Sequence, residues 1–231
     1  MKLSIIIPCF NEEKYIEQVI DSIIKQKIED KEIVVVNDAS TDKTKDILIQ
    51  LKENKKIDTL INHETNLGKG GAVRSALKKT TGEIIIIQDA DLEYNPKDFF
   101  KLVKPIIDGR ADVVYGSRFI GGGEDAHRVL YFWHRVANGI LTTLANILID
   151  MNLTDMETGY KAFKKTAVNN ITIEENRFGF EPEITIKLAK KKLRFFEVGV
   201  SYNGRTYDEG KKIGLKDGFR AVYCLFKYKF F

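Results

Sequence analysis

The sequence has 231 residues, enough for one large α/β domain or two small ones with a sizeable core. Hydrophobic residues make up 43% and charged residues 30%, which excludes a disordered or fibrous chain. The net charge of +4 conceals a basic end, because residues 185–231 contain three times as many Lys and Arg as Asp and Glu. Such an end indicates either an anionic partner or an ordinary solvated basic face.

Solidly apolar segments alternate with amphipathic ones along the first half of the chain. They predict strands at residues 3–10, 32–38, 58–64, 83–91 and 111–119, and helices at residues 11–26, 40–54, 66–80 and 95–107, with Asn11 as an N-cap. The alternation predicts an α/β fold with a mainly parallel sheet covered by helices on both faces.

The pattern changes after residue 123. We expect one or two apolar-faced helices at residues 129–151, a turn and strand at 155–163, a helix at 180–191 and a strand at 193–202. A glycine-rich basic loop follows at residues 203–214, and an amphipathic basic segment at 215–231. The chain shows no clean linker, so a single domain over residues 1–231 is the simplest division.

Targeting and redox features are few. Cys9 and Cys224 give no disulfide framework, so a reducing cytosolic setting is the default. The N-terminus lacks the long apolar run of a signal peptide. The best membrane candidate, residues 136–149, is shorter than the roughly 20 apolar residues of a span. Any membrane role is therefore expected to be peripheral.

Ligands of parallel α/β sheets bind at the carboxyl ends of the strands, which selects residues 8–12, 37–42, 88–93 and 116–119 as one site. Four isoleucines lead there into Asp89 and Asp91, which would point the same way on a strand, with Glu93 beyond them. Clustered acids repel one another, and Mg²⁺ or Mn²⁺ would relieve the repulsion. The alternative is that these acids cap the next helix, which begins near Asn95.

Asp38 follows another predicted strand. Its carboxylate could accept a hydrogen bond from a base N–H or from ribose hydroxyls, or it could close a turn or cap a helix together with Ser40 or Thr41. Residues 68–71, GKGG, resemble a phosphate cradle that includes Lys69. They match neither the P-loop nor the dinucleotide pattern, so a plain helix N-terminus is the alternative.

Three arginines are candidate phosphate ligands, because a guanidinium offers a fork of donors; they are Arg118, Arg135 and Arg205. Surface ion pairs are the alternative for each of them. The three histidines, His63, His127 and His134, share no metal-ligand spacing, and no Ser-His-Asp arrangement is evident from the sequence.

Four stretches within residues 3–119, IIIPCFNEE, VVVNDASTD, NLGKGGAVRSA and IIIIQDADLEY, together resemble family 2 glycosyltransferases of the GT-A fold. In the second half, VVYGSRF, TDMETGYKAFKK and GRTYDEGKKIG resemble the polyprenyl-phosphate branch, which includes dolichyl-phosphate mannose synthases. The resemblance implies a Rossmann-like three-layer sandwich with C-terminal amphipathic helices. It also implies a nucleotide-sugar-binding half at residues 1–122 and an acceptor-binding half with interfacial helices at residues 123–231.

The resemblance assigns roles to individual residues. It implies that the donor nucleotide contacts Pro8, Phe10, Glu12, Asp38, Gly68, Lys69, Asp89 and Ala90. It implies that Mg²⁺ or Mn²⁺ binds at Asp89, Asp91 and Glu93, although many relatives have glutamine in place of Glu93. Arg118, Arg135 and Arg205 would neutralise the acceptor phosphate and the leaving diphosphate. The implied catalytic residues are Asp91, Arg118 and Asp155.

The predicted activity is a metal-dependent, inverting transfer from a GDP- or UDP-linked sugar to a polyprenyl or dolichyl phosphate. A phosphate monoester is already anionic at neutral pH and needs no general base. The alternative is a hydroxyl acceptor on a glycan or lipid, with Asp155 or Glu157 as base. The enzyme is expected to be cytoplasmic and peripheral at the cytoplasmic face of a membrane, alone, with a membrane-anchoring protein partner, or as a fragment of a longer protein.

Two other classes are less consistent with the sequence. A sugar-phosphate nucleotidyltransferase would have a glycine-rich signature after its first strand, where this chain has PCFNEE. A non-catalytic regulatory module would not need both Asp89 and Asp91. Nucleic acid is not an expected partner, because the basic end has no recognised recognition motif.

Overall fold

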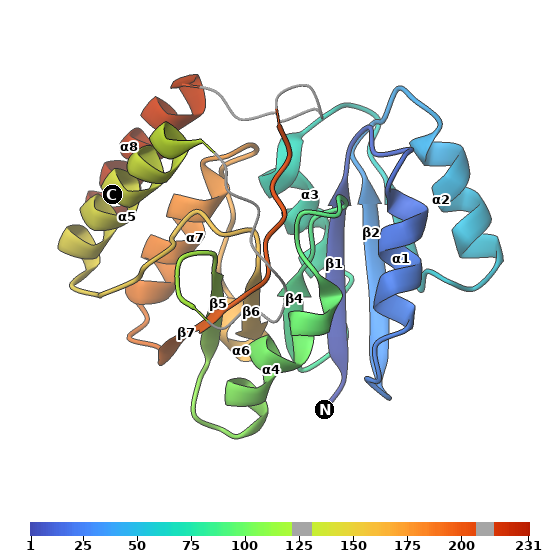
Figure 1. The fold of residues 1–231 in the computed structure, drawn as a ribbon, viewed down its shortest axis with the longest axis horizontal. Coiled ribbons are helices and arrows are strands. Elements are labelled where there is room, and N and C mark those ends of the chain that lie inside the picture. Colours follow the sequence, from blue (N-terminus) through green and yellow to red (C-terminus); the bar gives the residue numbers. More distant parts are fainter. Residues whose placement is uncertain (122–130, 207–214) are drawn as a thin grey trace.

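A computed structural model describes residues 1–121, 131–206 and 215–231 of the chain. Within these residues the strands form a seven-stranded sheet in the order β3-β2-β1-β4-β6-β5-β7 (Figure 1). Strand β6 pairs antiparallel with β4 and β5, and the other neighbours are parallel, which confirms the predicted mainly parallel sheet. The strands are β1 Leu3–Cys9, β2 Lys31–Asn37, β3 Thr59–Asn62, β4 Ile84–Ile87, β5 Val113–Ser117, β6 Lys161–Lys164 and β7 Phe195–Gly199.

Helices cover both faces of the sheet (Figure 1). Helices α1, α2 and α4 pack on one face, and α3 and α7 on the other. Strand β1 shows why both faces are apolar, because Ile5 and Ile7 point into the first core and Ile6 into the second. The helices are α1 Ile16–Ile24, α2 Thr44–Glu53, α3 Gly68–Leu77, α4 Phe99–Ile107, α5 Phe132–Ile149, α6 Lys165–Val168, α7 Phe180–Ala189 and α8 Leu215–Phe230, with a 3₁₀ turn at Pro96–Asp98.

Helices α5 and α8 lie side by side and pack on α7, beyond the sheet (Figure 1). A small apolar core joins the three helices through residues that include Ala145, Ile186 and Leu225. Helix α5 ends at Ile149, and the residue that caps it, Asp150, has a left-handed φ of 55°. In the parts of the chain that the structure describes, no helix is both long and apolar enough to cross a bilayer.

Two local predictions were wrong. Helix α1 begins at Ile16, not at Asn11, which has a φ of 52° and accepts a hydrogen bond from the Thr41 backbone N–H at 2.8 Å. Strand β4 ends at Ile87, so Asp89 and Asp91 lie in the turn after the strand. The strand rule that their side chains share a side therefore does not apply to them. His127 and part of the predicted basic loop, residues 207–214, lie outside the described residues.

Candidate active site

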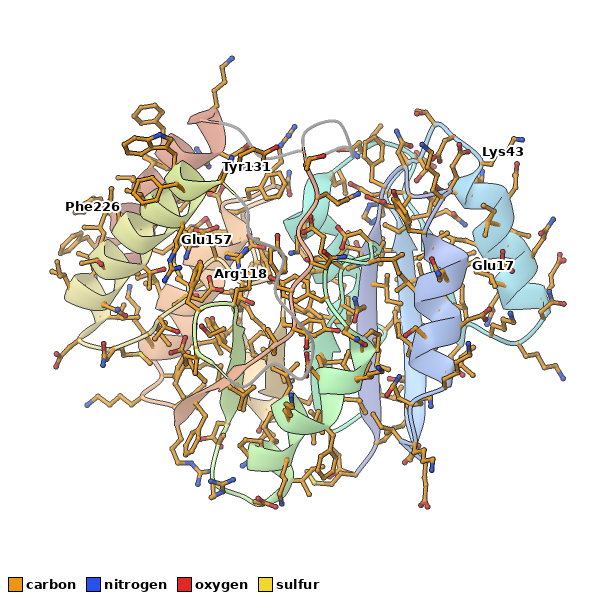
Figure 2. All side chains as sticks on the ribbon, viewed as in Figure 1. Glu17, Lys43, Arg118, Tyr131, Glu157 and Phe226 are labelled. Atoms are coloured by element: carbon orange, nitrogen blue, oxygen red, sulfur yellow. The ribbon has the colours of Figure 1, made fainter. Side chains whose placement is uncertain are left out.

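The carboxyl ends of β1, β2, β4 and β5 open onto one cavity of about 1020 Å³. Helices α5, α7 and α8, the start of α3 and the segment around Tyr202 complete its walls. Nearly every site residue predicted from the sequence lines this cavity: Pro8, Phe10, Glu12, Asp38, Gly68, Lys69, Asp89, Ala90, Asp91, Glu93, Arg118, Arg135 and Arg205. The exception is Asp155, which is fully buried behind Arg118. Figure 2 shows Arg118, Glu157 and Tyr131, three residues near this cavity, between the sheet and the α5–α8 pair.

Asp38 closes the start of α3. Its carboxylate accepts hydrogen bonds from the backbone N–H groups of Leu67 at 2.9 Å and Gly68 at 2.6 Å. It also contacts His63 Nδ1 at 2.7 Å. These backbone donors hold the Asp38 carboxylate at the cavity wall. Asp38 therefore caps a helix, as in the alternative given above, but the helix is α3, which is distant from it in sequence.

Lys69 links two acids at the cavity wall. Its Nζ lies 2.9 Å from Asp89 Oδ1 and 3.0 Å from Glu181 Oε1. These two carboxylates outweigh the effect of burial and raise the pKa of Lys69. Gly159 allows Asp89 to sit here, because a Cβ at residue 159 would lie only 2.2 Å from Asp89 Oδ2. The predicted GKGG segment therefore presents its lysine to acids in this structure.

Asp91 belongs to a second ionic cluster, around Arg205. Arg205 Nη2 lies 2.5 Å from Asp91 Oδ2, and Nη1 lies 3.2 Å from Glu12. Glu93 accepts from the Arg205 backbone N–H at 2.7 Å and from the Tyr202 hydroxyl at 3.0 Å. Burial, and then the charges of Asp89 and Glu93, raise the pKa of Asp91 to about 8 despite Arg205.

The two aspartates suit a divalent cation better than the predicted trio does. Mg²⁺ commonly takes one or two protein carboxylates and completes its shell with waters and substrate phosphates. Asp89 and Asp91 both line the cavity, and Asp89 Oδ1 and Asp91 Oδ2 are held there by Lys69 and Arg205. Glu93 is held by Tyr202 and Arg205, and across the described residues no three His, Cys, Asp or Glu side chains are grouped to hold a metal.

Arg118 and Asp155 form a buried bidentate pair. Arg118 Nε and Nη2 donate to the two oxygens of Asp155, both at 2.7 Å, and Asn138 Nδ2 donates to the same carboxylate at 3.3 Å. The guanidinium also lies over the Tyr202 ring, 5.2 Å from its centroid. Asp155 therefore orients Arg118 towards the cavity. Asp155 itself is fully buried and cannot contact an acceptor hydroxyl, which disfavours Asp155 as a general base.

Arg135 lies on the exposed side of the cavity, on α5. Its guanidinium stacks on Phe119 at 5.5 Å from the ring centroid. Cation–π contact leaves the N–H groups at the edge of the guanidinium available to an anion. Arg118, Arg135 and Arg205 thus bring three cations to one cavity.

The structure adds Glu181, which was not singled out from the sequence, and places Glu157, a candidate base in the sequence, at the same cavity. Glu181 lines the cavity, is only 3% exposed, and pairs with Lys69 through one of its oxygens. Glu157 also lines it, and burial, reinforced by the charge of Glu181, raises the pKa of Glu157 to about 8. The sequence contained one signal for Glu181, because an acidic residue within the apolar helix α7 indicates a buried carboxylate.

Comparison with known proteins shows the family to which the chain belongs. The model of the family described as "Glycosyl transferase family 2" matches residues 4–172, most of the chain. The chain therefore belongs to glycosyl transferase family 2, and it is a glycosyltransferase.

Two relatives within this family are named as enzymes that act on dolichyl phosphate. The chain is 29% identical to the UDP-N-acetylglucosamine–dolichyl-phosphate N-acetylglucosaminyltransferase of Methanococcus voltae, over 97% of this chain and 95% of that protein. It is 28% identical to the dolichol-phosphate mannosyltransferase of Pyrococcus furiosus, over 99% of this chain but 65% of that longer protein. These relatives confirm the predicted resemblance to the dolichyl-phosphate sugar synthases.

A solved structure confirms the GT-A fold. Glucosyl-3-phosphoglycerate synthase from Mycobacterium tuberculosis, in complex with Mn²⁺, UDP and phosphoglyceric acid, superposes with a TM-score of 0.74 over 99% of this chain and 78% of that one, at 20% identity. Another structure of that enzyme contains Mg²⁺ and UDP. At this identity the likeness shows the fold alone.

Proposed function

We propose that this chain transfers a sugar from a GDP- or UDP-linked donor to a polyprenyl phosphate, with Mg²⁺ or Mn²⁺ bound by Asp89 and Asp91. The observation that supports this most is that Asp89 and Asp91 line the same cavity as Arg118, Arg135 and Arg205. A nucleotide sugar, a divalent ion and a lipid phosphate together need both kinds of charge. The relatives' names and the metal-containing neighbours add support.

The donor would lie along the strand ends. Pro8, Phe10, Glu12 and Asp38 would line the nucleoside part of the cavity, while Gly68, Lys69, Asp89 and Ala90 would border the diphosphate. Lys69 already bridges Asp89 and Glu181, so it would also keep the acids of the donor site in place.

The chemistry follows from the charges. An oxygen of the acceptor phosphate would attack the sugar's anomeric carbon, and the bond to the diphosphate would break on the opposite face, which inverts the anomeric centre. When bound, the metal supplies Lewis-acid stabilisation to the departing diphosphate. Arg118, held by Asp155, would bind the acceptor phosphate with Arg135, and Arg205 would leave Asp91 to pair with the developing negative charge.

The outer surface of α5 and α8 suits a lipid acceptor. Large exposed aromatic side chains gather there: Phe132, Trp133, Phe219, Tyr223, Phe226 and Phe230. Lys216, Arg220, Lys227 and Lys229 lie on α8 among them. Figure 2 shows Phe226 at the outer side of α8. Aromatic and basic side chains on one amphipathic helix favour an anionic membrane interface, here the cytoplasmic face of a membrane. A membrane-anchoring protein partner has no support in the comparisons.

A hydroxyl acceptor is the alternative, and Glu157 is the observation that favours it. Its Oε1 is buried in the described structure without a hydrogen-bond partner, close to the cavity. A carboxyl group with a pKa of about 8 can act as a base near neutral pH, although it is mostly protonated there.

A thermal-shift panel tests the donor site. UDP, GDP, CDP and dTDP are each added with Mg²⁺, with Mn²⁺ and with a chelator. A ligand at about 100 times its Kd stabilises the fold by about 2.7 kcal/mol, which shifts the midpoint measurably. We expect UDP or GDP to raise the midpoint more with metal than with chelator. A folded sample that responds to none of the four would contradict the proposal.

A further inference from the structure

Three side chains from different elements form a continuous hydrogen-bonded row beside the cavity. Asp38 follows β2, His63 follows β3, and Ser75 lies on α3. His63 Nδ1 lies 2.7 Å from Asp38 Oδ1, and His63 Nε2 lies 2.8 Å from Ser75 Oγ. No Ser-His-Asp arrangement was evident in the sequence, because the three residues are far apart in the chain.

The partners determine the tautomer of His63. A carboxylate can only accept, so Nδ1 has the proton and donates it to Asp38. In the neutral ring Nε2 is then an acceptor, and the Ser75 hydroxyl donates to it. The backbone N–H of His63 donates to the Asn37 carbonyl at 2.9 Å, which fixes the base of the side chain on β2. The ring is thus constrained at three points.

Among the described residues, Asp38 connects the His63 ring to the cavity. Asp38 lines the cavity, whereas His63 and Ser75 do not. The Asp38 oxygen that binds His63 also accepts from Leu67 N–H, and the other oxygen accepts from Gly68 N–H. The next residue, Lys69, bridges Asp89 and Glu181. The orientation of the His63 ring therefore bears on the start of α3 and on the acids of the donor site.

We propose that His63, oriented by Ser75, is a positioning residue for the donor nucleotide. Its Nδ1–H fixes the rotation of the Asp38 carboxylate, so that the carboxylate caps α3 and presents a constant face to the nucleoside. Ser75 keeps the ring in the tautomer that donates to Asp38. This inference rests on the proposed function, because it takes the cavity to bind a nucleotide sugar.

Two substitutions of one histidine test the inference. The amide nitrogen of asparagine takes about the place of Nδ1, and that of glutamine about the place of Nε2. His63→Asn can therefore still donate to Asp38, whereas His63→Gln can donate only towards Ser75. We expect the Kd of the nucleoside diphosphate selected in the thermal-shift panel to rise about tenfold in His63→Gln, but less than about threefold in His63→Asn. Ser75→Ala should lie between them.

Steady-state kinetics separate positioning from a merely structural role. The donor KM should follow the Kd, while kcat at saturating donor changes far less, because His63 touches no reacting group. Equal donor affinity in His63→Gln and the wild type would overturn the inference. Equal losses in both variants, accompanied by equal drops in Tm, would also overturn it. If the wild type binds none of the nucleotides, the proposed function itself fails.

Discussion

Arg205 Nη2 lies 2.5 Å from Asp91 Oδ2 and joins a basic segment to the acids after β4. The same guanidinium reaches Glu12, and the backbone N–H of Arg205 reaches Glu93. In this arrangement Arg205 partly neutralises acids that the proposed function assigns to a donor and its metal. When the donor and its metal bind, the metal ion would replace the Arg205 guanidinium as the cation at Asp91.

Arg205→Gln should destabilise the metal-free protein. The substitution removes the guanidinium that donates to both Asp91 and Glu12, so two buried carboxyl groups lose their shared hydrogen-bonding cation. We expect a loss of about 2 kcal/mol in urea unfolding with chelator, and partial recovery with Mg²⁺. Arg110→Gln is the control, because Arg110 is exposed and pairs with Asp108 at the surface. An unchanged unfolding free energy in Arg205→Gln would contradict the ionic cluster.

Asp89→Ala and Asp91→Ala should each lower kcat/KM on the order of 100-fold or more, while the proteins remain folded. Both remove a carboxylate from the proposed metal pair, and stabilisation of the leaving diphosphate is lost with the ion. Asp46→Ala, on an exposed position of α2, is the matched control. Near-normal activity in both cavity variants would revive the hypothesis of a non-catalytic module.

Stability should fall with rising pH because of Glu157. Burial raises its pKa from 4.5 to about 8 in the folded state, so between these values the folded protein binds more protons than the unfolded chain. The free energy of unfolding therefore decreases as pH rises through this window. Glu157→Gln removes this contribution. We expect the variant to gain about 2 kcal/mol on the wild type between pH 6 and pH 8, at about 1.4 kcal/mol per pH unit, measured by urea unfolding. Parallel pH profiles would be inconsistent with a protonated Glu157.

Breaking the pair of Arg118 and Asp155 should be costly. Asp155→Asn leaves a buried guanidinium without its counter-charge, at a cost of about 3 kcal/mol or more. Combining it with Arg118→Gln should cost less than the sum of the single variants, because the two residues act as one unit. A double-mutant cycle in urea measures this coupling. Strict additivity would show that the pair is not a unit.

The α5–α8 surface should determine membrane binding. Trp133→Ser and Phe219→Ser remove side chains that are 76% and 78% exposed, so their effect on folding should be small. Cosedimentation with anionic phospholipid vesicles should fall about tenfold in the double variant. Phe100→Ser is the control, because Phe100 is 62% exposed on α4, away from this surface. Equal binding by wild type and double variant would exclude this surface.

The sequence predicted the fold well because its strands are unambiguous. Apolar runs such as residues 84–87 are buried on both faces, and alternation with amphipathic helices leaves few other arrangements. The rule that ligands bind at strand ends was enough to gather the cavity residues. Side-chain partners could not be predicted in the same way. Lys69 meets Glu181, and Asp38 meets His63, only after distant elements pack together.

Transfer itself is the most direct test of the account. The purified protein is incubated with a nucleotide sugar that has a radiolabelled sugar, using the nucleotide selected by the thermal-shift panel, together with Mg²⁺ and a short polyprenyl phosphate. The mixture is then extracted with organic solvent. We expect label in the organic phase that depends on the lipid phosphate, on the metal and on Asp91. No lipid-dependent label in the organic phase, from an enzyme that binds the nucleotide, would contradict the proposed transfer.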